Sequence, residues 1–310
     1  MLNVLFSAKP YRWDEYEKPL RTAFEQAGLD VNLSTQHRAE DVDYIVFAPN
    51  GPVQDFSPYI KTRAVMSLWA GVETVVGNKT LTQPLVRMVD DGLTQGMVEW
   101  VVGHVMRHHL GIDGHIHGQD GVWRELTYPP LAKDRVVTIL GVGALGAACG
   151  QAISTLGFQV RGWSRSAKQI DGVQCFHGSD GLRAALDQAE IVVALLPQTD
   201  DTENTLDADR IGLMAKGGFI INPGRGPLID DKALLDALES GQIAHATLDV
   251  FRIEPLPVEH PFWAHPNVTV TPHIASFTRP DTAAQIIAKN IKTDQAGMPL
   301  PNVVDRQSGY

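Results

Sequence analysis

The sequence has few cysteines, no long hydrophobic run and no excess of basic residues. Its 310 residues include only two cysteines, Cys149 and Cys175, too few and too far apart for a disulfide framework or a CxxC-type zinc site. We therefore expect reduced thiols, used as small core residues, in a cytoplasmic protein. No stretch approaches the ~18 uninterrupted apolar residues that span a bilayer, and MLNVLFSAKP lacks the features of a signal peptide.

Acidic residues outnumber basic residues by 36 to 26, and the formal net charge is -10. Such a surface repels nucleic-acid phosphates and anionic lipid, so we expect neither nucleic acid nor a membrane as a partner. A small acidic substrate would need local basic groups and backbone N–H donors. With 44% hydrophobic and 20% charged residues, the composition is typical of a packed protein, and the length favours two cores.

Strand-like runs alternate with helical patterns along most of the chain, which predicts an α/β protein with parallel sheets covered on both faces. In the first part, the expected strands are 2–7, 31–34, 43–48, 64–68 and 85–88, with a helix over 14–28. In the second part, the expected strands are 135–140, 158–163, 190–197, 217–222, 244–250 and 268–271.

Helix signals divide the chain further. A long helix is expected over 94–110, followed by an irregular Gly- and His-rich arm over 111–123, and a domain boundary lies near here. An Asp cap and a Gly stop predict a helix within 230–241. A last helix is expected after Thr278 as N-cap, with Asp281 in the capping-box position.

The strongest local signal is a buried strand, a glycine-rich turn and an Ala-rich helix in RVVTILGVGALGAACG. In this turn Gly141 permits a tight bend, Gly143 lets a pyrophosphate approach the backbone, and Gly146 lets the helix pack on the strand. The helix N-terminus then offers N–H donors to the anion. We predict a dinucleotide site here that includes Ala144 and Leu145; a purely structural turn is the alternative.

The next predicted strand ends in GWSRSAK, where a dinucleotide fold usually presents an acidic residue to the ribose 2′-hydroxyl. This chain has Ser164 there, followed by Arg165 and Lys168. Basic side chains suit a 2′-phosphate through charge-assisted hydrogen bonds. The segment therefore favours NADP(H) over NAD(H), although NAD(H) remains an alternative cofactor and a solvated basic turn an alternative interpretation.

Three further segments carry polar residues directly after predicted strands. They are INPGRGPLID with Arg225, LDVFRIEPLP with Asp249 and Glu254, and VTVTPHIAS with His273. Carboxyl ends of parallel strands line one crevice, so we expect these side chains to meet. An arginine suits a carboxylate, a histidine exchanges a proton near neutral pH, and a carboxylate fixes the histidine tautomer. The segments predict a reaction centre, although each residue taken singly also has an ordinary structural explanation.

The glycine motif together with NPGRGPLID, DVFRIEPLP, HPFWAHPNVTVTPHIAS and LPQT resembles the D-isomer-specific 2-hydroxyacid dehydrogenases in order and spacing. The resemblance covers nearly the whole chain and is greatest to the glyoxylate/hydroxypyruvate reductase branch, including the non-acidic ending GWSRS. It implies a Rossmann-type dinucleotide domain, residues 96–276, inserted into a flavodoxin-like substrate domain formed by residues 1–95 and 277–310. It also implies a homodimer formed through residues 94–125.

The resemblance further implies roles for single residues. Arg225 would hold the substrate carboxylate and keto oxygen, Glu254 would orient His273, and His273 would be the general acid. Asp249 would meet the nicotinamide carboxamide. Other residues expected along the cofactor are Leu196, Pro197 and Thr199 of LPQT, together with Pro223 and Gly224.

Ala70 and Gly71, in SLWAGVE, match the family loop whose backbone N–H groups bind the substrate carboxylate. The family commonly has GAGVD here, whereas this chain has Trp69 and Glu73. A bulky indole at this loop predicts a preference for two- and three-carbon keto acids; ordinary packing of Trp69 is the alternative.

Histidines at 104, 108, 109, 115 and 117 mimic metal-ligand spacing. No acidic or cysteine partner with fitting spacing accompanies them, so we expect no metal site and interpret these histidines as interface or surface residues.

Taken together, the sequence predicts an NADPH-dependent reductase of small 2-keto acids such as glyoxylate and hydroxypyruvate. One alternative is an NAD-dependent D-2-hydroxyacid dehydrogenase of the D-lactate or phosphoglycerate type, against which Ser164 argues. The other is a non-catalytic, dinucleotide-sensing binding protein like the corepressors that share this fold, which has no need of the full Arg, Glu and His set.

Overall fold

The computed structural model describes residues 1–123, 125 and 128–306, so the last four residues of the predicted 277–310 segment lie outside the described residues. The chain divides into two compact units. The first unit consists of Met1–Leu93 and Phe277–Tyr310, and the second of Thr94–Ser276. Both ends of the chain therefore belong to one unit, and the other unit is a continuous insertion.

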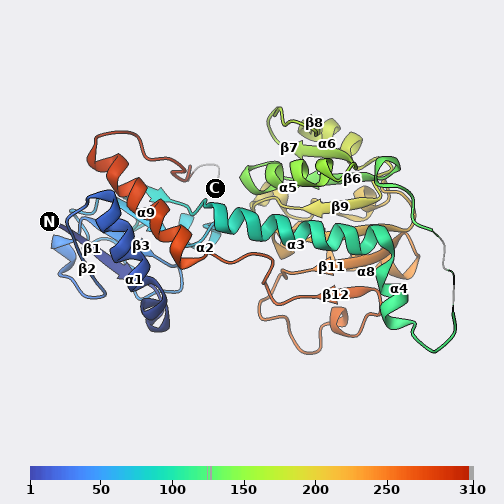
Figure 1. The fold of residues 1–310 in the computed structure, drawn as a ribbon, viewed down its shortest axis with the longest axis horizontal. Coiled ribbons are helices and arrows are strands. Elements are labelled where there is room, and N and C mark those ends of the chain that lie inside the picture. Colours follow the sequence, from blue (N-terminus) through green and yellow to red (C-terminus); the bar gives the residue numbers. More distant parts are fainter. Residues whose placement is uncertain (124, 126–127, 307–310) are drawn as a thin grey trace. The chain divides into compact units, whose positions relative to one another are not determined.

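The first unit has, among its described residues, a five-stranded parallel sheet in the order β2-β1-β3-β4-β5 (Figure 1). This is the strand order of flavodoxin-like folds. Alternate side chains of β3 enter two cores, with Tyr44 and Val46 on one face and Ile45 and Phe47 on the other. The strands are β1 (Leu2–Ser7), β2 (Val31–Ser34), β3 (Tyr44–Phe47), β4 (Ala64–Ser67) and β5 (Leu85–Val86).

Two helices from opposite ends of the chain pack together on this sheet (Figure 1). They are α1 (Pro10–Ala27) and α9 (Pro280–Gln295). Leu20 and Phe24 of α1 share one core with Ile287 and Ile291 of α9. The shorter elements of the unit are η1 (Ala39–Asp41) and α2 (Glu73–Val76).

The predicted cap of the last helix is wrong. The N-cap of α9 is Arg279, whose side chain makes no capping hydrogen bond. The Thr278 hydroxyl instead donates to the backbone oxygen of Leu68 (2.7 Å), which lies directly after β4. The Thr278 hydroxyl therefore bonds to a residue distant in sequence and does not cap α9 as the local pattern predicted.

The second unit has a seven-stranded parallel sheet, counted over the described part of the chain, in the order β12-β11-β10-β9-β6-β7-β8. Counted from β8, this is the Rossmann order with β12 added at the far edge. The predicted fold class, two doubly wound parallel-sheet domains, is confirmed. The strands are β6 (Val136–Leu140), β7 (Gln159–Ser164), β8 (Gln174–His177), β9 (Ile191–Ala194), β10 (Gly218–Asn222), β11 (Ile243–Leu248) and β12 (Val268–Val270).

Helices cover both faces of this sheet. Ile191 and Val193 of β9 share a core with Val101 of α3, whereas Val192 and Ala194 share a core with Leu234 of α8. The helices are α3 (Asp91–Leu110), which crosses the unit boundary in the chain, α4 (Ile112–His117), α5 (Ala144–Thr155), α6 (Gly178–Leu186), α7 (Ala208–Ile211) and α8 (Asp231–Glu239). Short 3-10 turns are η2 (Ala132–Asp134), η3 (Asp200–Thr202), η4 (Gly226–Leu228) and η5 (Pro261–Trp263).

Several boundaries differ from expectation. The expected irregular arm over 111–123 contains α4, and the polar strand β8 was not predicted. The cap of α8 is as predicted, because the Asp230 side chain accepts from the N–H of Ala233 at 2.9 Å. No helix within the described residues is both long and apolar enough to cross a membrane.

Candidate active site

The carboxyl edge of the second sheet collects most of the residues predicted for the site. Because β12, β11, β10, β9, β6 and β7 are neighbours in one parallel sheet, the residues that follow them emerge at the same edge. His273 follows β12, Glu254 follows β11 and Arg225 follows β10. The LPQT segment follows β9, the glycine turn follows β6, and Ser164 ends β7.

His273 and Glu254 form a hydrogen-bonded pair. The Nδ1 atom of His273 lies 2.7 Å from Oε2 of Glu254, and Oε1 of Glu254 accepts from the Phe251 N–H at 2.9 Å. The side chains are 52% and 36% exposed, so the pair keeps contact with solvent. An ionised Glu254 requires a proton on Nδ1, which leaves Nε2 as the nitrogen for proton exchange.

The pair raises the proton affinity of His273. The hydrogen bond to Glu254 raises the pKa of His273 above its usual range, against an opposing effect of burial and of the Arg225 charge. Burial alone would raise the pKa of Glu254, but hydrogen bonds from His273 and the Phe251 N–H hold it below its usual range. The imidazolium and the carboxylate therefore stabilise each other's charged forms, which suits His273 to donate a proton.

The backbone at His273 is held in an unusual conformation. Its φ is 55°, in the left-handed region that non-glycine residues rarely adopt. Its backbone N–H donates to the backbone oxygens of Asp249 (2.8 Å) and Thr271 (3.0 Å). Such strained backbone occurs at sites where the surroundings determine the direction of a side chain.

Asp249 supports this same loop. Its side chain is fully buried, and its carboxylate accepts from the Thr271 hydroxyl (2.6 Å) and from the N–H groups of Ile274 and Ala275 (both 2.8 Å). These three hydrogen bonds of the carboxylate are therefore all to the segment that carries His273. The predicted contact between Asp249 and the nicotinamide carboxamide stays a prediction.

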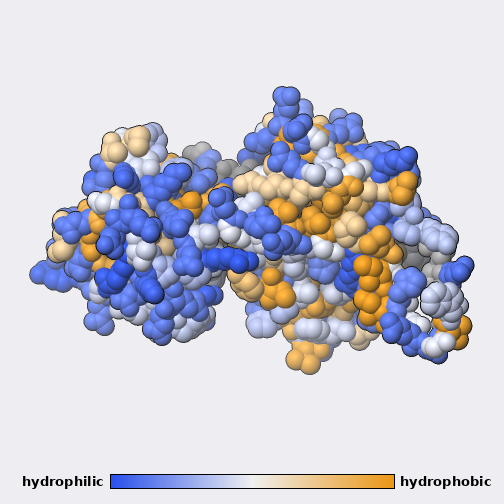
Figure 2. All heavy atoms as spheres, in the orientation of Figure 1, coloured by the Kyte–Doolittle hydropathy of each residue, from blue (hydrophilic) through white to orange (hydrophobic). Residues whose placement is uncertain are grey.

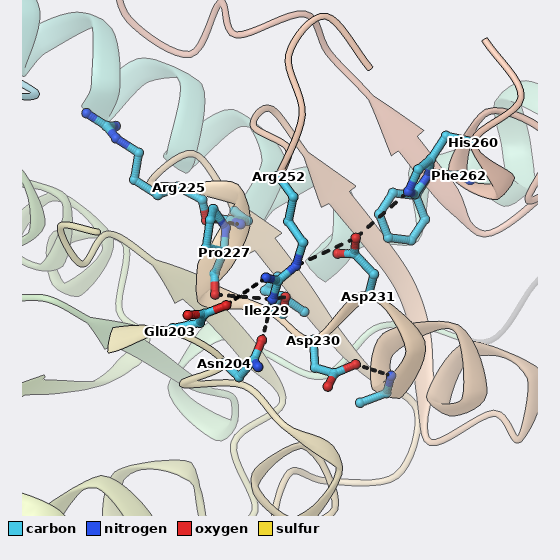
Figure 3. Close-up of polar contacts among 12 residues, drawn as sticks. Glu203, Asn204, Arg225, Pro227, Ile229, Asp230, Asp231, Arg252, His260 and Phe262 are labelled. Atoms are coloured by element: carbon cyan, nitrogen blue, oxygen red, sulfur yellow. Dashed lines mark hydrogen bonds and ion pairs between the residues drawn. The ribbon is translucent and has the colours of Figure 1, made fainter. Parts of the chain in front are cut away.

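Arg225 lies in a loop tied down by Asn222. The buried Asn222 side chain donates to the Arg225 oxygen (2.9 Å) and accepts from the Gly224 N–H (3.1 Å). Pro223 and Gly224 are buried, and a Cβ on Gly224 would lie 2.6 Å from the Ala194 oxygen. The Arg225 guanidinium donates to the Gly224 oxygen (2.7 Å), and its side chain points away from the neighbouring Arg252 (Figure 3).

The glycine turn has the form that a pyrophosphate requires. Gly141 has φ 102°, and a Cβ there would lie 2.6 Å from the Leu195 backbone, so no other residue fits. A Cβ on Gly146 would collide with the Gly141 oxygen at 1.9 Å, whereas the space beside Gly143 is open. Gly143 is also the N-cap of α5 and supplies no side-chain acceptor, so the first N–H groups of α5, at Ala144 and Leu145, fit an anion.

The basic turn and the LPQT segment lie at the same edge. The Ser164 hydroxyl donates to the Ser166 oxygen (2.8 Å), and the side chains of Arg165 and Lys168 are exposed. Leu196 is buried, and the Thr202 hydroxyl donates to the Pro197 oxygen (2.7 Å) and accepts from the Thr199 N–H (2.8 Å). The predicted cofactor residues of the second unit thus stand at or after the ends of five strands that are neighbours in the sheet: β7, β6, β9, β10 and, with Asp249, β11.

The loop with Trp69, Ala70 and Gly71 belongs to the first unit. Trp69 is 39% exposed, and its backbone is fixed by the Ser67 hydroxyl, which donates to the Trp69 oxygen (2.9 Å) and accepts from its N–H (3.0 Å). The Met88 N–H also donates to the Trp69 oxygen at 3.1 Å. The backbone is well held, and its predicted contact with a substrate carboxylate stays a prediction.

The interpretation of the α3 histidines as interface or surface residues is wrong for two of them, which are buried within the chain itself. His108 and His109 are 3% and 6% exposed, and His108 stacks on Phe219 and lies 2.9 Å from the Thr247 hydroxyl. The helical pattern hid this because α3 packs against the sheet through a polar as well as an apolar stripe. Among the residues that the structure describes, no group of three or more His, Cys, Asp or Glu is placed to hold a metal ion.

The sequence interpretation missed two residues that shape this edge. Asn222 begins the NPGRG motif and is the last residue of β10, and a polar residue at the end of a buried strand was an available signal. Arg252 follows β11 and bonds to loops distant in sequence (Figure 3). Nothing in the local pattern around Arg252 indicates those partners.

Comparison with known proteins agrees with the fold. Residues 101–275 match the family model of the D-isomer specific 2-hydroxyacid dehydrogenase NAD binding domain. A glyoxylate/hydroxypyruvate reductase A of Serratia proteamaculans is 41% identical over 317 residues, covering 100% of both chains. The one from Yersinia enterocolitica is 37% identical over 301 residues, covering 92% of this chain and 95% of the relative.

Two solved structures have the same fold over their whole length. A D-isomer specific 2-hydroxyacid dehydrogenase of Xanthobacter autotrophicus Py2, in complex with NADPH and MES, has a TM-score of 0.90 and 38% identity, covering 100% of this chain and 99% of that chain. An NADPH-dependent glyoxylate/hydroxypyruvate reductase of Sinorhizobium meliloti, in complex with NADP and sulfate, has a TM-score of 0.87 and 32% identity, covering 100% of both chains. The chain is an oxidoreductase and belongs to the family of D-isomer-specific 2-hydroxyacid dehydrogenases.

Proposed function

We propose that this protein reduces small 2-keto acids, such as glyoxylate and hydroxypyruvate, to 2-hydroxy acids with NADPH. The observation that carries the proposal is the His273–Glu254 pair at the sheet edge that also bears Arg225 and the glycine turn. The relatives named glyoxylate/hydroxypyruvate reductase support the substrate class.

NADPH, when bound at the glycine turn, would supply a hydride for the keto carbon. The Nε2–H of His273 then protonates the forming alkoxide, and Glu254 stabilises the imidazolium before transfer. Arg225 binds the substrate carboxylate and stabilises charge on the keto oxygen. Backbone N–H groups at Ala70 and Gly71 are further donors proposed for the carboxylate, and Trp69 is proposed to favour short substrates.

The preference for NADPH rests on the end of β7. Ser164 cannot repel a 2′-phosphate as an aspartate would, and Arg165 and Lys168 add positive charge. Structures of relatives in complex with NADPH or NADP support this assignment. NAD(H) is proposed as a poorer cofactor, because the glycine turn and α5 bind the pyrophosphate common to both.

A homodimer in the cytoplasm is proposed as the state of the protein. Hydrophobic side chains are exposed in and after the α3–α4 region, and Figure 2 shows hydrophobic atoms gathered over it. A surface of this kind is typical of a protein interface. The exposed residues are Leu110, Ile116, Val122, Trp123, Tyr128 and Leu131.

The decisive experiment is a steady-state assay of purified protein with glyoxylate, hydroxypyruvate, 2-oxobutyrate and phenylpyruvate, each with NADPH and NADH. We expect kcat/KM to be highest for glyoxylate or hydroxypyruvate with NADPH. If phenylpyruvate were the best substrate, the preference for small keto acids would be wrong. If no keto acid led to oxidation of NADPH or NADH, the alternative of a non-catalytic binding protein would be favoured.

A substitution at Arg165 tests the preference for NADPH separately. Arg165→Ala should weaken NADPH use by about 1.5–3 kcal/mol, the usual range for hydrogen bonds to charged groups, and leave NADH use nearly unchanged. Equal losses with both cofactors would show that Arg165 does not contact the 2′-phosphate.

A further inference from the structure

Arg252 ties together loops that follow three neighbouring strands. It lies after β11, three residues beyond Asp249 and two before Glu254, and its side chain is 30% exposed. The guanidinium reaches across to the loops that follow β9 and β10 (Figure 3). Its partners are Oε1 of Glu203 (3.1 Å), Oδ1 of Asn204, the backbone oxygens of Pro227 (3.5 Å) and Ile229 (2.7 Å), and Oδ2 of Asp231 (3.8 Å).

These partners are next to the residues of the reaction centre. Pro227 and Ile229 follow Arg225 by two and four residues, and Glu203 follows Thr199 in the segment after β9. Arg252 itself is adjacent to Phe251, whose N–H fixes Glu254. One side chain thus joins the loop of Arg225 to the segment that carries the carboxylate partner of His273.

Apolar packing holds this segment only in part: Phe251 is buried and Leu256 packs against the core, but the residues beside Arg252 and near the end of the segment are exposed. Ile253 and Val258 are 66% and 91% exposed. Behind the segment lies a cavity of about 140 Å³, lined in part by Leu234, Leu248 and Phe262, so the underlying contact is incomplete. A loop that is only partly buried and borders a cavity depends on its polar contacts as well as its apolar packing for its position.

The charge of Arg252 also stabilises the ionised form of the neighbouring Asp231 carboxylate. Burial raises the pKa of Asp231, and the charge of Arg252 is the largest effect that opposes it. The His260 Nε2 lies 3.8 Å from Asp231 on the other side (Figure 3). Only a guanidinium offers five donors in one plane, enough for two carbonyls, an amide and two carboxylates; a lysine ammonium offers three.

We propose that Arg252 is a positioning residue, which holds the segment of Glu254 and the loop of Arg225 in the relation that the reaction requires. Its described contacts do not include His273, so it would act on the reaction through Glu254 and Arg225. The inference rests on the proposed function, because Glu254 and Arg225 matter in this way only if the site reduces a keto acid.

The test compares Arg252→Met and Arg252→Lys with Arg161→Met. Methionine keeps an unbranched apolar stem beside the cavity and removes every donor. Arg161 is a matched control in the same unit, where its guanidinium donates to a single carbonyl, that of Asp187, at 2.6 Å. For each protein we would measure kcat and KM for glyoxylate, the pH profile of kcat, the Tm, and the His273 pKa by NMR.

For Arg252→Met we expect kcat to fall about tenfold with a smaller change in KM, since displacement of a reacting group by about 1 Å can cost up to ~10²-fold. The alkaline limb of the kcat profile should move to lower pH, because a looser segment weakens the Glu254–His273 hydrogen bond. The same change should appear in the NMR pKa of His273, whose other charged neighbours are Arg225 and Asp249. Arg252→Lys should lie between wild type and Arg252→Met, and Arg161→Met should match wild type.

The NMR measurement distinguishes failure of the positioning role of Arg252 from failure of the proposed reductase function. It needs no turnover, and the signal of His273 among the 11 histidines is assigned from its loss in His273→Asn. An unchanged His273 pKa and unchanged kcat in Arg252→Met would overturn the positioning role. A lower Tm with an unmoved pKa and pH limb would also overturn it, leaving Arg252 a purely structural residue. If wild type reduces no keto acid but the pKa still moves, the proposed function fails and the mechanical link between Arg252 and Glu254 stands.

Discussion

His273 and His108 belong to the same unit, and their surroundings change them in opposite directions. His273 keeps half of its surface in solvent and bonds to an ionised carboxylate, which raises its pKa. His108 is buried against Phe219 and lies beside a hydroxyl, so burial first, and then the neighbouring His245 and Arg107, lower its pKa to about 3. The comparison teaches that an anionic partner with access to water suits a histidine to act as an acid, whereas burial without a hydrogen-bonded carboxylate leaves it a neutral core residue.

The largest expected effect tests the catalytic side of this comparison. Replacement of His273 by Asn should lower kcat by about 10²–10⁴-fold, the usual contribution of a general acid. The free energy of unfolding should change by less than about 1 kcal/mol, because the side chain is half exposed. Steady-state kinetics and urea unfolding give the two values. A large loss of stability with little loss of kcat would reverse the roles assigned to the two histidines.

The next largest effect is the pH dependence of the free energy of unfolding, which tests the assignment of His108 as a neutral core residue. His108 is neutral when folded down to about pH 3, whereas the unfolded chain protonates it near pH 6.5. The contribution of His108 to the free energy of unfolding is therefore complete above pH 6.5. It is lost as the pH falls toward 3, by at most about 1.4 kcal/mol per pH unit. For His273 the sign is opposite: the raised pKa adds stability below its usual value, which is lost as the pH rises through the folded-state pKa.

A paired variant isolates the His108 contribution. In His108→Phe/Thr247→Val both members of the 2.9 Å contact become apolar, so stability at pH 8 should change little. Urea unfolding between pH 5 and pH 8 should then show a weaker loss in acid than in wild type. Thr247→Val alone keeps the histidine and serves as the control. Identical acid slopes in all three proteins would exclude His108 as the source. Other groups facing it are His104, Arg107 and His245, with Asp113 beyond Arg107.

The smallest expected effect lies at the partner of His273. In Glu254→Gln the carboxylate that raises the His273 pKa is gone, so the alkaline limb of kcat should move to lower pH. Substrate KM should change less than kcat, because Glu254 acts through His273. An unmoved limb would mean that a group other than His273 titrates in the profile.

The parts of the fold set by local pattern were predictable, and the parts set by distant contacts were not. Buried strands such as β9 have continuous apolar runs, and the residues at their ends could be placed at one edge from topology alone. The Thr278 cap failed because the Leu68 oxygen, far away in sequence, accepts from its hydroxyl. β8 was missed because it is short and polar and lies at a sheet edge.

The candidate site divides in the same way. Arg225, Glu254 and His273 stand in sequence motifs that indicate their chemistry, and each motif directly follows a strand of the second sheet. Arg252 has no such motif, because its partners follow other strands and only the folded sheet brings them near. The burial of His108 was hidden for a similar reason, since no single-helix pattern shows that Phe219 and Thr247 receive it.

The pairing of α1 with α9 has a consequence for synthesis of the chain. A ribosome makes α1 early and α9 only after the entire second unit has been synthesised. Throughout that interval the apolar face of α1 around Leu20 and Phe24 lacks the helix that covers it. The inserted unit can close its sheet during translation, whereas the unit that begins the chain is the last to be completed.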